Sequence, residues 1–351
     1  VGPPWAGEAL AALAFLMTGL GLHMTQTAGL ALASDLADEE TRPRVVALLY
    51  VMFLVGMGVS AIVVGYLLAD FSSLRLIQVV QGVAVATLIF NLIALWKQER
   101  VRPMTREERA APKPRFSDAM SDLAAGGLAG RLLAVVFFGT MAFQMQDILL
   151  EPYGGEILGL SVSATTMLTG AWALGAMIGF ALAARWLADR INPCHMAARG
   201  IMAGIAAFSA VILAAPMAST GLFFFGTMLI GLGSGLFAVA TLTTAMTMPV
   251  GGTAGRGLAL GAWGAAQATA AGLGIALGGG IKDAVSHLAN SGDLGPALVG
   301  PATGYSFVYH IEIGLLFMTL IALGPLMRRH RSMPPKNSGA PGRIGLSEFP
   351  T

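Results

Sequence analysis

The sequence predicts an all-α membrane protein whose chain crosses the bilayer many times. Of its 351 residues, 55% are hydrophobic and only 11% are charged, whereas charged residues make up about 25% of a soluble domain. Apolar runs of about 20 residues, the length that spans a bilayer as a helix, also follow one another along the chain. The net charge of +2 argues against a nucleic-acid partner, and the single cysteine excludes an intrachain disulfide framework.

Nine apolar runs have spanning length, and each is expected to form one transmembrane helix. They lie at residues 8–33, 44–69, 74–96, 132–150, 162–187, 197–215, 221–247, 256–281 and 305–327. A charged, proline-bearing connector at 97–131 separates the third run from the fourth, and a polar tail follows at 328–351. Because the chain opens at Val1, directly before an apolar run, and shows no signal peptide, we expect it to lack its natural N-terminus.

Positively charged residues set the expected orientation of the helices. Nineteen of the 21 Lys and Arg residues fall in the connector, in the tail and in the loops that lie on the same side of the membrane. The opposite side holds only Arg75 and Lys282. Since the cytoplasmic side of a membrane protein carries the excess of Lys and Arg, the connector and the tail are predicted to be cytoplasmic.

An internal repeat explains the odd number of spans. At an offset of about 212 residues, Gly19 falls on Gly231 and, in the next helix, Arg44 falls on Arg256. Two consecutive helices therefore recur in the same orientation, as in the parallel halves of major facilitator proteins. In that register the first span is the fourth helix of a twelve-helix bundle, so nine of twelve helices are present. The predicted division is helices four to six in 1–96, the connector in 97–131, a six-helix half in 132–327 and the tail in 328–351.

Three long stretches carry a resemblance to a known family. They are "GLHMTQTAGLALASDLADEETRPRVVALLYVMFLVGMGVSA" at 21–61, "FQMQDILLEPYGGEILGLSVSATTMLT" at 143–169 and "TLTTAMTMPVGGTAGRGLALGAWGAAQATAAG" at 241–272. Together they resemble the PucC/LhaA-type proteins of photosynthetic bacteria, the bacteriochlorophyll-delivery branch of the major facilitator superfamily. The resemblance covers nearly the whole chain.

This resemblance implies a role in assembling light-harvesting complexes. The implied cofactor is bacteriochlorophyll, with carotenoid or lipid as alternative ligands. The implied partners are nascent antenna polypeptides, with the reaction-centre core and pigment-synthesis enzymes as further ones. The first stretch is more similar to the branch that serves the core antenna. The implied location is the bacterial cytoplasmic membrane, including its photosynthetic, intracytoplasmic part.

Acidic and amide side chains gather at the end of the fourth span. Gln144, Asp147 and Glu151 are spaced i, i+3 and i+7, which places them on one face of a continuous helix. We expect that helix to end before Pro152. The simplest interpretation is that Asp147 makes a hydrogen bond between helices and that Glu151 is an interfacial helix-end residue. The functional hypothesis is that this face meets a ligand, and that Asp147 ligates the magnesium of a pigment directly or through water.

His23 is the other candidate magnesium ligand. It lies well inside the first span, and Gln26 shares its helical face at i+3. A lone histidine in a membrane is often a hydrogen-bond partner of a neighbouring helix, but a neutral imidazole is also a good axial ligand for a chlorin magnesium. By the rise per residue, His23 lies too deep to share a site with Glu151.

The helix expected at 256–281 is almost wholly Gly and Ala. Trp263 and Gln267 lie one turn apart on it, and Gly274 and Gly278 form a small-xxx-small pair. Close helix packing is one interpretation of this pattern. A smooth helix that carries one aromatic and one amide side chain could also border a flat macrocycle, so Trp263 and Gln267 complete the candidate set of cofactor-binding residues.

Three hypotheses for the function remain open. The first is a bacteriochlorophyll-binding assembly factor without chemical turnover, since the sequence contains no metal cluster, nucleophile–base pair or phosphate loop. The second is a proton-coupled secondary transporter with Asp147 as the titrating group, which requires several converging ionisable groups in a central cavity. The third is a purely protein-binding scaffold for antenna helices.

Overall fold

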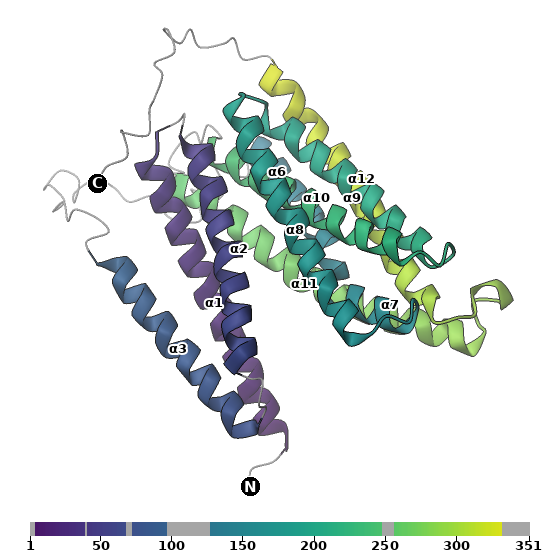
Figure 1. Ribbon diagram of the computed structural model, residues 1–351. Helices are drawn as coiled ribbons and strands as arrows, with labels where there is room; N and C mark the ends of the chain where they lie inside the picture. The colour runs from purple at the N-terminus through teal and green to yellow at the C-terminus, as the bar shows by residue number, and fades with distance from the viewer. Residues whose placement is uncertain (1–3, 39–40, 68–71, 97–126, 248–255, 332–351) are drawn as a thin grey trace, which may run out of the picture.

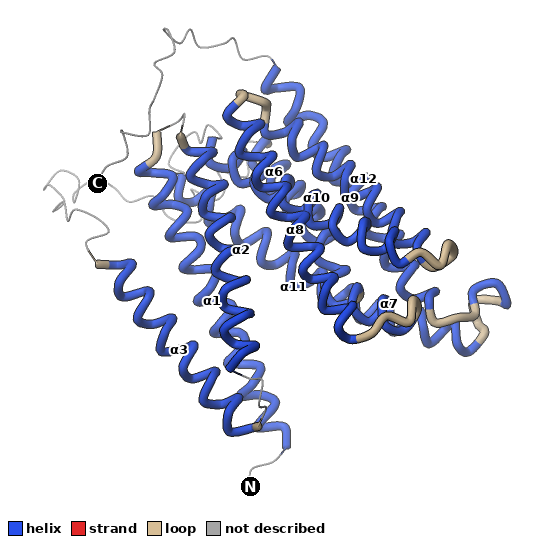
Figure 2. The backbone as a smooth tube through the Cα atoms, viewed as in Figure 1, coloured by secondary structure: helices blue, strands red, loops and turns tan. Residues whose placement is uncertain are grey.

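The computed structural model describes residues 4–38, 41–67, 72–96, 127–247 and 256–331. Within these ranges every regular element is a helix, as Figure 2 shows. Eight helices are long and apolar enough to cross a membrane. The prediction of an all-α, multi-pass membrane protein is therefore confirmed.

Every predicted span contains a helix. The long helices are α1 (Pro4–Leu36), α2 (Arg42–Leu67), α3 (Ser73–Leu95), α6 (Leu128–Met145), α8 (Val162–Ala188), α9 (Pro193–Ala214), α10 (Thr220–Thr247), α11 (Arg256–Ser291) and α12 (Ala302–Arg331). The helix α2 is not among the eight that satisfy both length and hydropathy, although its 26 residues are long enough to span about 30 Å. The connector and the tail, at 97–126 and 332–351, lie outside the described residues.

The end of the fourth span differs from the prediction. Instead of stopping before Pro152, the chain makes a short 3-10 turn, η1 (Gln146–Ile148), and continues as the helix α7 (Leu150–Glu156). Pro152 lies in the first turn of α7, where its missing N–H group needs no partner within the helix. The proline is thus compatible with a new helix start, and the interruption falls several residues earlier.

The helix α11 also runs further than predicted, to Ser291 instead of residue 281. The two charged residues at the expected end, Lys282 and Asp283, form an ion pair of 3.2 Å. The Lys282 ammonium lies 4.8 Å from the centre of the Tyr305 ring. The helix α11 thus continues for almost three turns beyond the apolar run.

The buried core belongs to the helices that follow the connector. Among the side chains that the structure describes, almost all buried hydrophobic ones come from residue 129 onward, with Leu30 and Val79 as the earlier ones. In this bundle α10 packs on α8 and α9, and α6 packs on α11 and α12. Close helix approach depends on glycine: a Cβ atom on Gly200 of α9 or Gly233 of α10 would lie 2.7 Å from the other's carbonyl oxygen.

The first two helices lean on one side of this bundle. Figure 1 shows α1 and α2 next to each other, with α2 against α8 and α1 against α11, while α3 lies beyond them on the side away from the bundle. The contact between α1 and α11 is tight, because a Cβ atom on Gly264 would lie 3.1 Å from the Thr27 hydroxyl oxygen. The two helix groups therefore meet along a seam formed by α1, α2, α8, α10 and α11.

Candidate functional site

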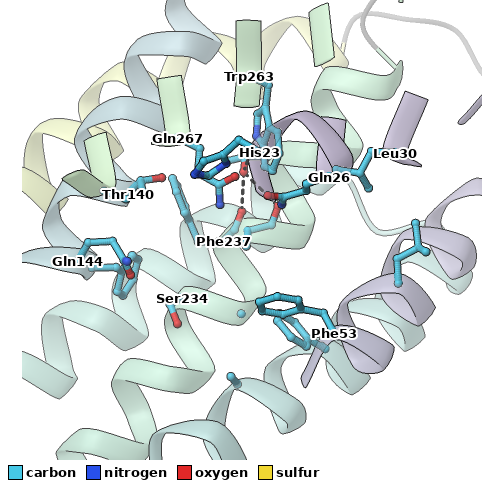
Figure 3. A pocket seen from close by; sticks show the side chains of 18 of the residues that line it. His23, Gln26, Leu30, Phe53, Thr140, Gln144, Ser234, Phe237, Trp263 and Gln267 are labelled. Atoms are coloured by element: carbon cyan, nitrogen blue, oxygen red, sulfur yellow. Dashed lines mark hydrogen bonds between the residues drawn. The ribbon is translucent and has the colours of Figure 1, made fainter. Parts of the chain in front are cut away.

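A cavity of about 610 Å³ lies in the seam between the two helix groups. Side chains from α1 and α2 line one side of it, and side chains from α6, α8, α10 and α11 line the other. Its size falls within the range of about 300–1,000 Å³ that is usual for small-molecule sites. Figure 3 shows the lining side chains converging on this space from both groups.

The structure brings five of the seven predicted site residues together in this cavity. They are His23, Gln26, Gln144, Trp263 and Gln267. Figure 3 shows His23, Gln26, Trp263 and Gln267 close to one another, with Gln144 across the cavity. These residues come from α1, α6 and α11, so the site depends on contacts between helices that are far apart in the sequence.

Four polar side chains of the site have no hydrogen-bond partner among the residues that the structure describes. His23, Gln26, Gln144 and Gln267 are all half-buried. Among the residues that the structure describes, none forms a hydrogen bond with the His23 imidazole or with these three amides. A half-buried imidazole and three amides therefore remain available to a ligand in the cavity.

Trp263 is held in place by its own hydrogen bond. The side chain is only 2% exposed, and its indole N–H donates to the hydroxyl of Thr241 on α10 over 3.4 Å. The Thr241 hydroxyl in turn donates to the Phe237 carbonyl oxygen over 2.9 Å. These bonds fix the indole plane as a wall of the cavity, while Gln267 follows one turn later on α11.

Most of the remaining lining is aromatic or aliphatic. The aromatic residues are Phe53, Phe143, Trp172, Phe180 and Phe237. Ser234, Thr25, Thr140 and Thr241 add small hydroxyl groups. Such a lining suits a flat, largely apolar ligand that carries a few hydrogen-bonding groups.

Asp147 and Glu151 do not line the cavity. Their predicted face requires one continuous α-helix, but the 3-10 turn at Gln146–Ile148 changes the angle between successive residues. Asp147 lies within that turn, and its side chain is exposed. Glu151 is exposed and accepts a hydrogen bond of 2.8 Å from the Thr169 hydroxyl of α8. The structure therefore separates these two acids from Gln144.

His23 and Glu151 do not share a site, as their depths along the helices predicted. Glu151 lies about 10 Å further along the helix axis than Gln144 and outside the lining of the cavity that contains His23.

The predicted packing role of Gly274 and Gly278 is also confirmed, because both glycines lie against the backbone of α6 at Met141 and Met145.

Metal binding at this site would depend on few protein groups. Within the described residues, no group of three or more His, Cys, Asp or Glu side chains could hold a metal ion. Among its described lining residues, the cavity offers one imidazole, that of His23. This donor set suits a metal ion whose other ligands belong to the bound molecule itself, and the residues present fit a pigment that carries its own metal.

One buried acid was not among the site residues predicted from the sequence. Glu312 of α12 is fully buried, and so is Tyr309 one turn before it. The signal was present in the sequence as a glutamate inside the apolar run 305–327. This residue adds a fourth ionisable group to the three that we singled out within the spans, and it lies outside the lining of the cavity.

The bundle and its cavity define a membrane protein with a major-facilitator-like fold. A solved structure supports this class: the crystal structure of a bacterial homologue of the iron transporter ferroportin in the outward-facing state matches with a TM-score of 0.62. The match covers 94% of this chain and 76% of that chain at 16% sequence identity. At this identity the likeness shows the fold alone.

The chain belongs to the family described as PUCC protein, whose model matches residues 1–331. An "Uncharacterized protein in puhA-bchM intergenic region" of Rhodobacter capsulatus is 58% identical over 351 residues, which is 100% of this chain and 73% of that protein. "Protein PucC" of Rhodovulum sulfidophilum is 51% identical over 286 residues, covering 81% of this chain and 62% of that protein. The resemblance noted in the sequence is thus confirmed at the level of the family.

Proposed function

We propose that this protein is an assembly factor for photosynthetic light-harvesting complexes, which binds bacteriochlorophyll and passes it to antenna polypeptides. The observation that carries the proposal is the cavity of about 610 Å³, in which one imidazole and three amides face aromatic walls. Membership of the PUCC protein family supports the same role. The role requires binding and release, with no chemical turnover.

The cavity residues have distinct tasks in this proposal. A bound bacteriochlorophyll would supply a magnesium ion, and the His23 imidazole is the protein group that would hold it. The amides of Gln26, Gln144 and Gln267 can donate hydrogen bonds to carbonyl substituents of the ring, and Trp263 provides a flat wall. The apolar walls exclude water, which strengthens each of these polar contacts.

The partners and the location follow from the same role. We propose that the core antenna polypeptides, rather than other membrane proteins, receive the pigment. We also propose that the reaction-centre core and the enzymes that synthesise the pigment are further partners of the protein. A delivery factor must work in the membrane that contains the antenna, which is the photosynthetic part of the bacterial cytoplasmic membrane. Carotenoid or lipid would suit the apolar walls, but neither carries a metal ion that the His23 imidazole could bind.

The decisive experiment is to purify the tagged protein from photosynthetic membranes and record its absorption spectrum. We expect bound bacteriochlorophyll in the native protein, and at least about tenfold weaker binding, about 1.4 kcal/mol, in His23→Leu. The matched control is His287→Leu, because His287 is exposed on α11 and lies outside the cavity lining. A colourless native protein, or equal loss in both variants, would contradict pigment binding at this site.

Co-purification tests the partner separately. Core antenna polypeptides should be recovered with the tagged protein, and their amount in the membrane should fall in the His23→Leu strain. Recovery of antenna polypeptides by a colourless protein would instead support a protein-binding scaffold. Accumulation of a small substrate by pigment-free vesicles containing the protein, driven by a pH gradient, would support a secondary transporter.

A further inference from the structure

Glu312 is an isolated acid at the centre of the helix bundle. Its side chain is 0% exposed, and within the described residues neither of its carboxyl oxygens has a hydrogen-bond partner. Counting the rise from Ala302, where α12 begins, places Glu312 about 15 Å along the helix, near the middle of a bilayer core of about 30 Å. A polar group in such a position costs free energy and usually serves a function.

Glu312 lies on α12, which packs against α6, α9 and α11. The Tyr309 hydroxyl, one turn away on α12, is also buried without a partner among the described residues. The Tyr309 ring stacks on Phe208 of α9, with 6.3 Å between the ring centres. In the 3-10 turn η1, which follows α6, the Gln146 side-chain oxygen is another buried acceptor without a partner in the described part of the chain.

The charged residues on α6, α9 and α11 either interact with other side chains or lie near the start of their helix. On α9, Arg199 lies 4.8 Å from the Trp186 ring centre and about 13 Å along the helix from Phe208. On α6, Arg131 is exposed near the start of the helix, and on α11 Lys282 is paired with Asp283. Other titratable side chains on these helices include Cys194 and His195 near the start of α9, His287 near the end of α11 and His310, exposed on α12.

Tyrosine rings connect the region of Glu312 to the surface of the bundle. The Tyr309 and Tyr153 ring centres are 5.6 Å apart, and those of Tyr153 and Tyr305 are 5.4 Å apart. The Tyr305 hydroxyl donates a hydrogen bond of 2.8 Å to Glu156, an exposed residue at the end of α7. These contacts link the Tyr309 ring, one turn from Glu312, to the bundle surface at Glu156.

An ionised Glu312 would be costly in this packing. A buried carboxylate without a counter-charge or hydrogen-bond donor loses several kcal/mol relative to water, whereas a neutral carboxylic acid avoids most of that cost. The packed bundle therefore favours the protonated side chain. Ionisation requires water at the carboxylate, and because the side chain is fully buried, water reaches it when the helices packed around it loosen.

We propose that Glu312 is an internal proton-binding site that links proton occupancy to the packing of α12 against α6 and α9. With the proton bound, the bundle adopts the closed packing seen here. When the proton leaves to water, the carboxylate draws water inward and loosens α12. This inference goes beyond the proposed function, because it concerns a site outside the pigment cavity and does not require pigment.

Infrared spectroscopy of the purified protein in lipid tests the bound proton. The native protein at neutral pH should show the C=O stretching band of a protonated carboxylic acid in an apolar environment. Glu312→Gln, which has the shape of the neutral acid, should remove that band, and Glu312→Asp should shift it. The matched control Glu156→Gln, at an exposed acid, should leave the band intact. A band that persists in Glu312→Gln would overturn the proposal.

Hydrogen exchange tests the link to packing. After correction for the intrinsic effect of pH, amide exchange in α12 should accelerate at least severalfold in the native protein when the pH is raised until the acid band disappears. In Glu312→Gln the corrected exchange should not depend on pH, because its side chain cannot ionise. If both proteins respond alike, or neither responds while the native band disappears, the link between proton and packing is wrong.

Discussion

Gly278 of α11 lies directly against the backbone carbonyl group of Met145, the last residue of α6. One turn earlier, a Cβ atom on Gly274 would lie 2.9 Å from the Met141 carbonyl oxygen and 3.5 Å from the Cβ atom of Gln144. Two glycines thus allow the backbones of α6 and α11 to approach each other closely. This contact fixes the distance between Gln144 and the residues of α11 across the cavity.

The contact between Gly278 and Met145 predicts that substitution of two glycines of α11 by alanine changes stability to different extents. Gly278→Ala should lower the free energy of unfolding by about 1–3 kcal/mol, because the added methyl group overlaps the Met145 carbonyl. Gly280→Ala is the matched control: its Cβ would meet nothing within 4 Å, and alanine favours the helix by up to about 1 kcal/mol. Unfolding in lipid or detergent, followed by circular dichroism, measures both. Equal stability of the two variants would show that α6 and α11 are not packed in this way.

The separation of Gln144 from Asp147 predicts unequal effects on pigment binding. Gln144 lines the cavity and Asp147 does not, so Gln144→Leu should weaken binding by about 1 kcal/mol, the value of one hydrogen bond. Asp147→Leu should leave it unchanged. Pigment titration of the purified variants, followed by absorption, measures both affinities. The reverse result would restore the hypothesis that Asp147 is a magnesium ligand.

The bond between Tyr305 and Glu156 ties α12 to the end of α7. Tyr305→Phe keeps the ring but removes the hydroxyl that donates over 2.8 Å, and the free energy of unfolding should fall by about 1 kcal/mol. Tyr66→Phe is the control, since Tyr66 is 82% exposed and should change little. Thermal unfolding in the same detergent compares the two. A loss no larger for Tyr305 than for Tyr66 would mean that this bond does not stabilise the fold.

The distribution of positive charge predicts the orientation in the membrane. A cysteine at Asp293, beyond the end of α11, should react with a membrane-impermeant reagent added from the periplasmic side, and a cysteine at Asp189, at the end of α8, should not. Both positions are exposed. The native Cys194 is buried and can be replaced by serine in the background. Labelling of position 189 alone would reverse the topology.

The local parts of the fold could be predicted from the sequence because they depend on single helices. The apolar runs predicted every span, and the Gly274 and Gly278 pair predicted a close helix contact. The end of the fourth span was predicted wrongly, because Pro152 can stop a helix or occupy its first turn. Only the packing of Tyr153, which is 0% exposed in the core, shows that α7 continues the span. Glu312 was visible as an acid in an apolar run, but its isolation depends on the three helices around it.

The sequence by itself determined which segments cross the membrane, which side carries the positive charge, and that His23, Gln144 and Gln267 are polar residues inside apolar helices. Those properties follow from composition and from the period of each helix. Only the tertiary structure decided that these three residues face one cavity while Asp147 and Glu151 do not. A helical period fixes which residues share a face of their own helix. It does not fix which helix that face meets, because that choice depends on backbone contacts such as Gly278 with Met145, formed between residues more than 100 positions apart.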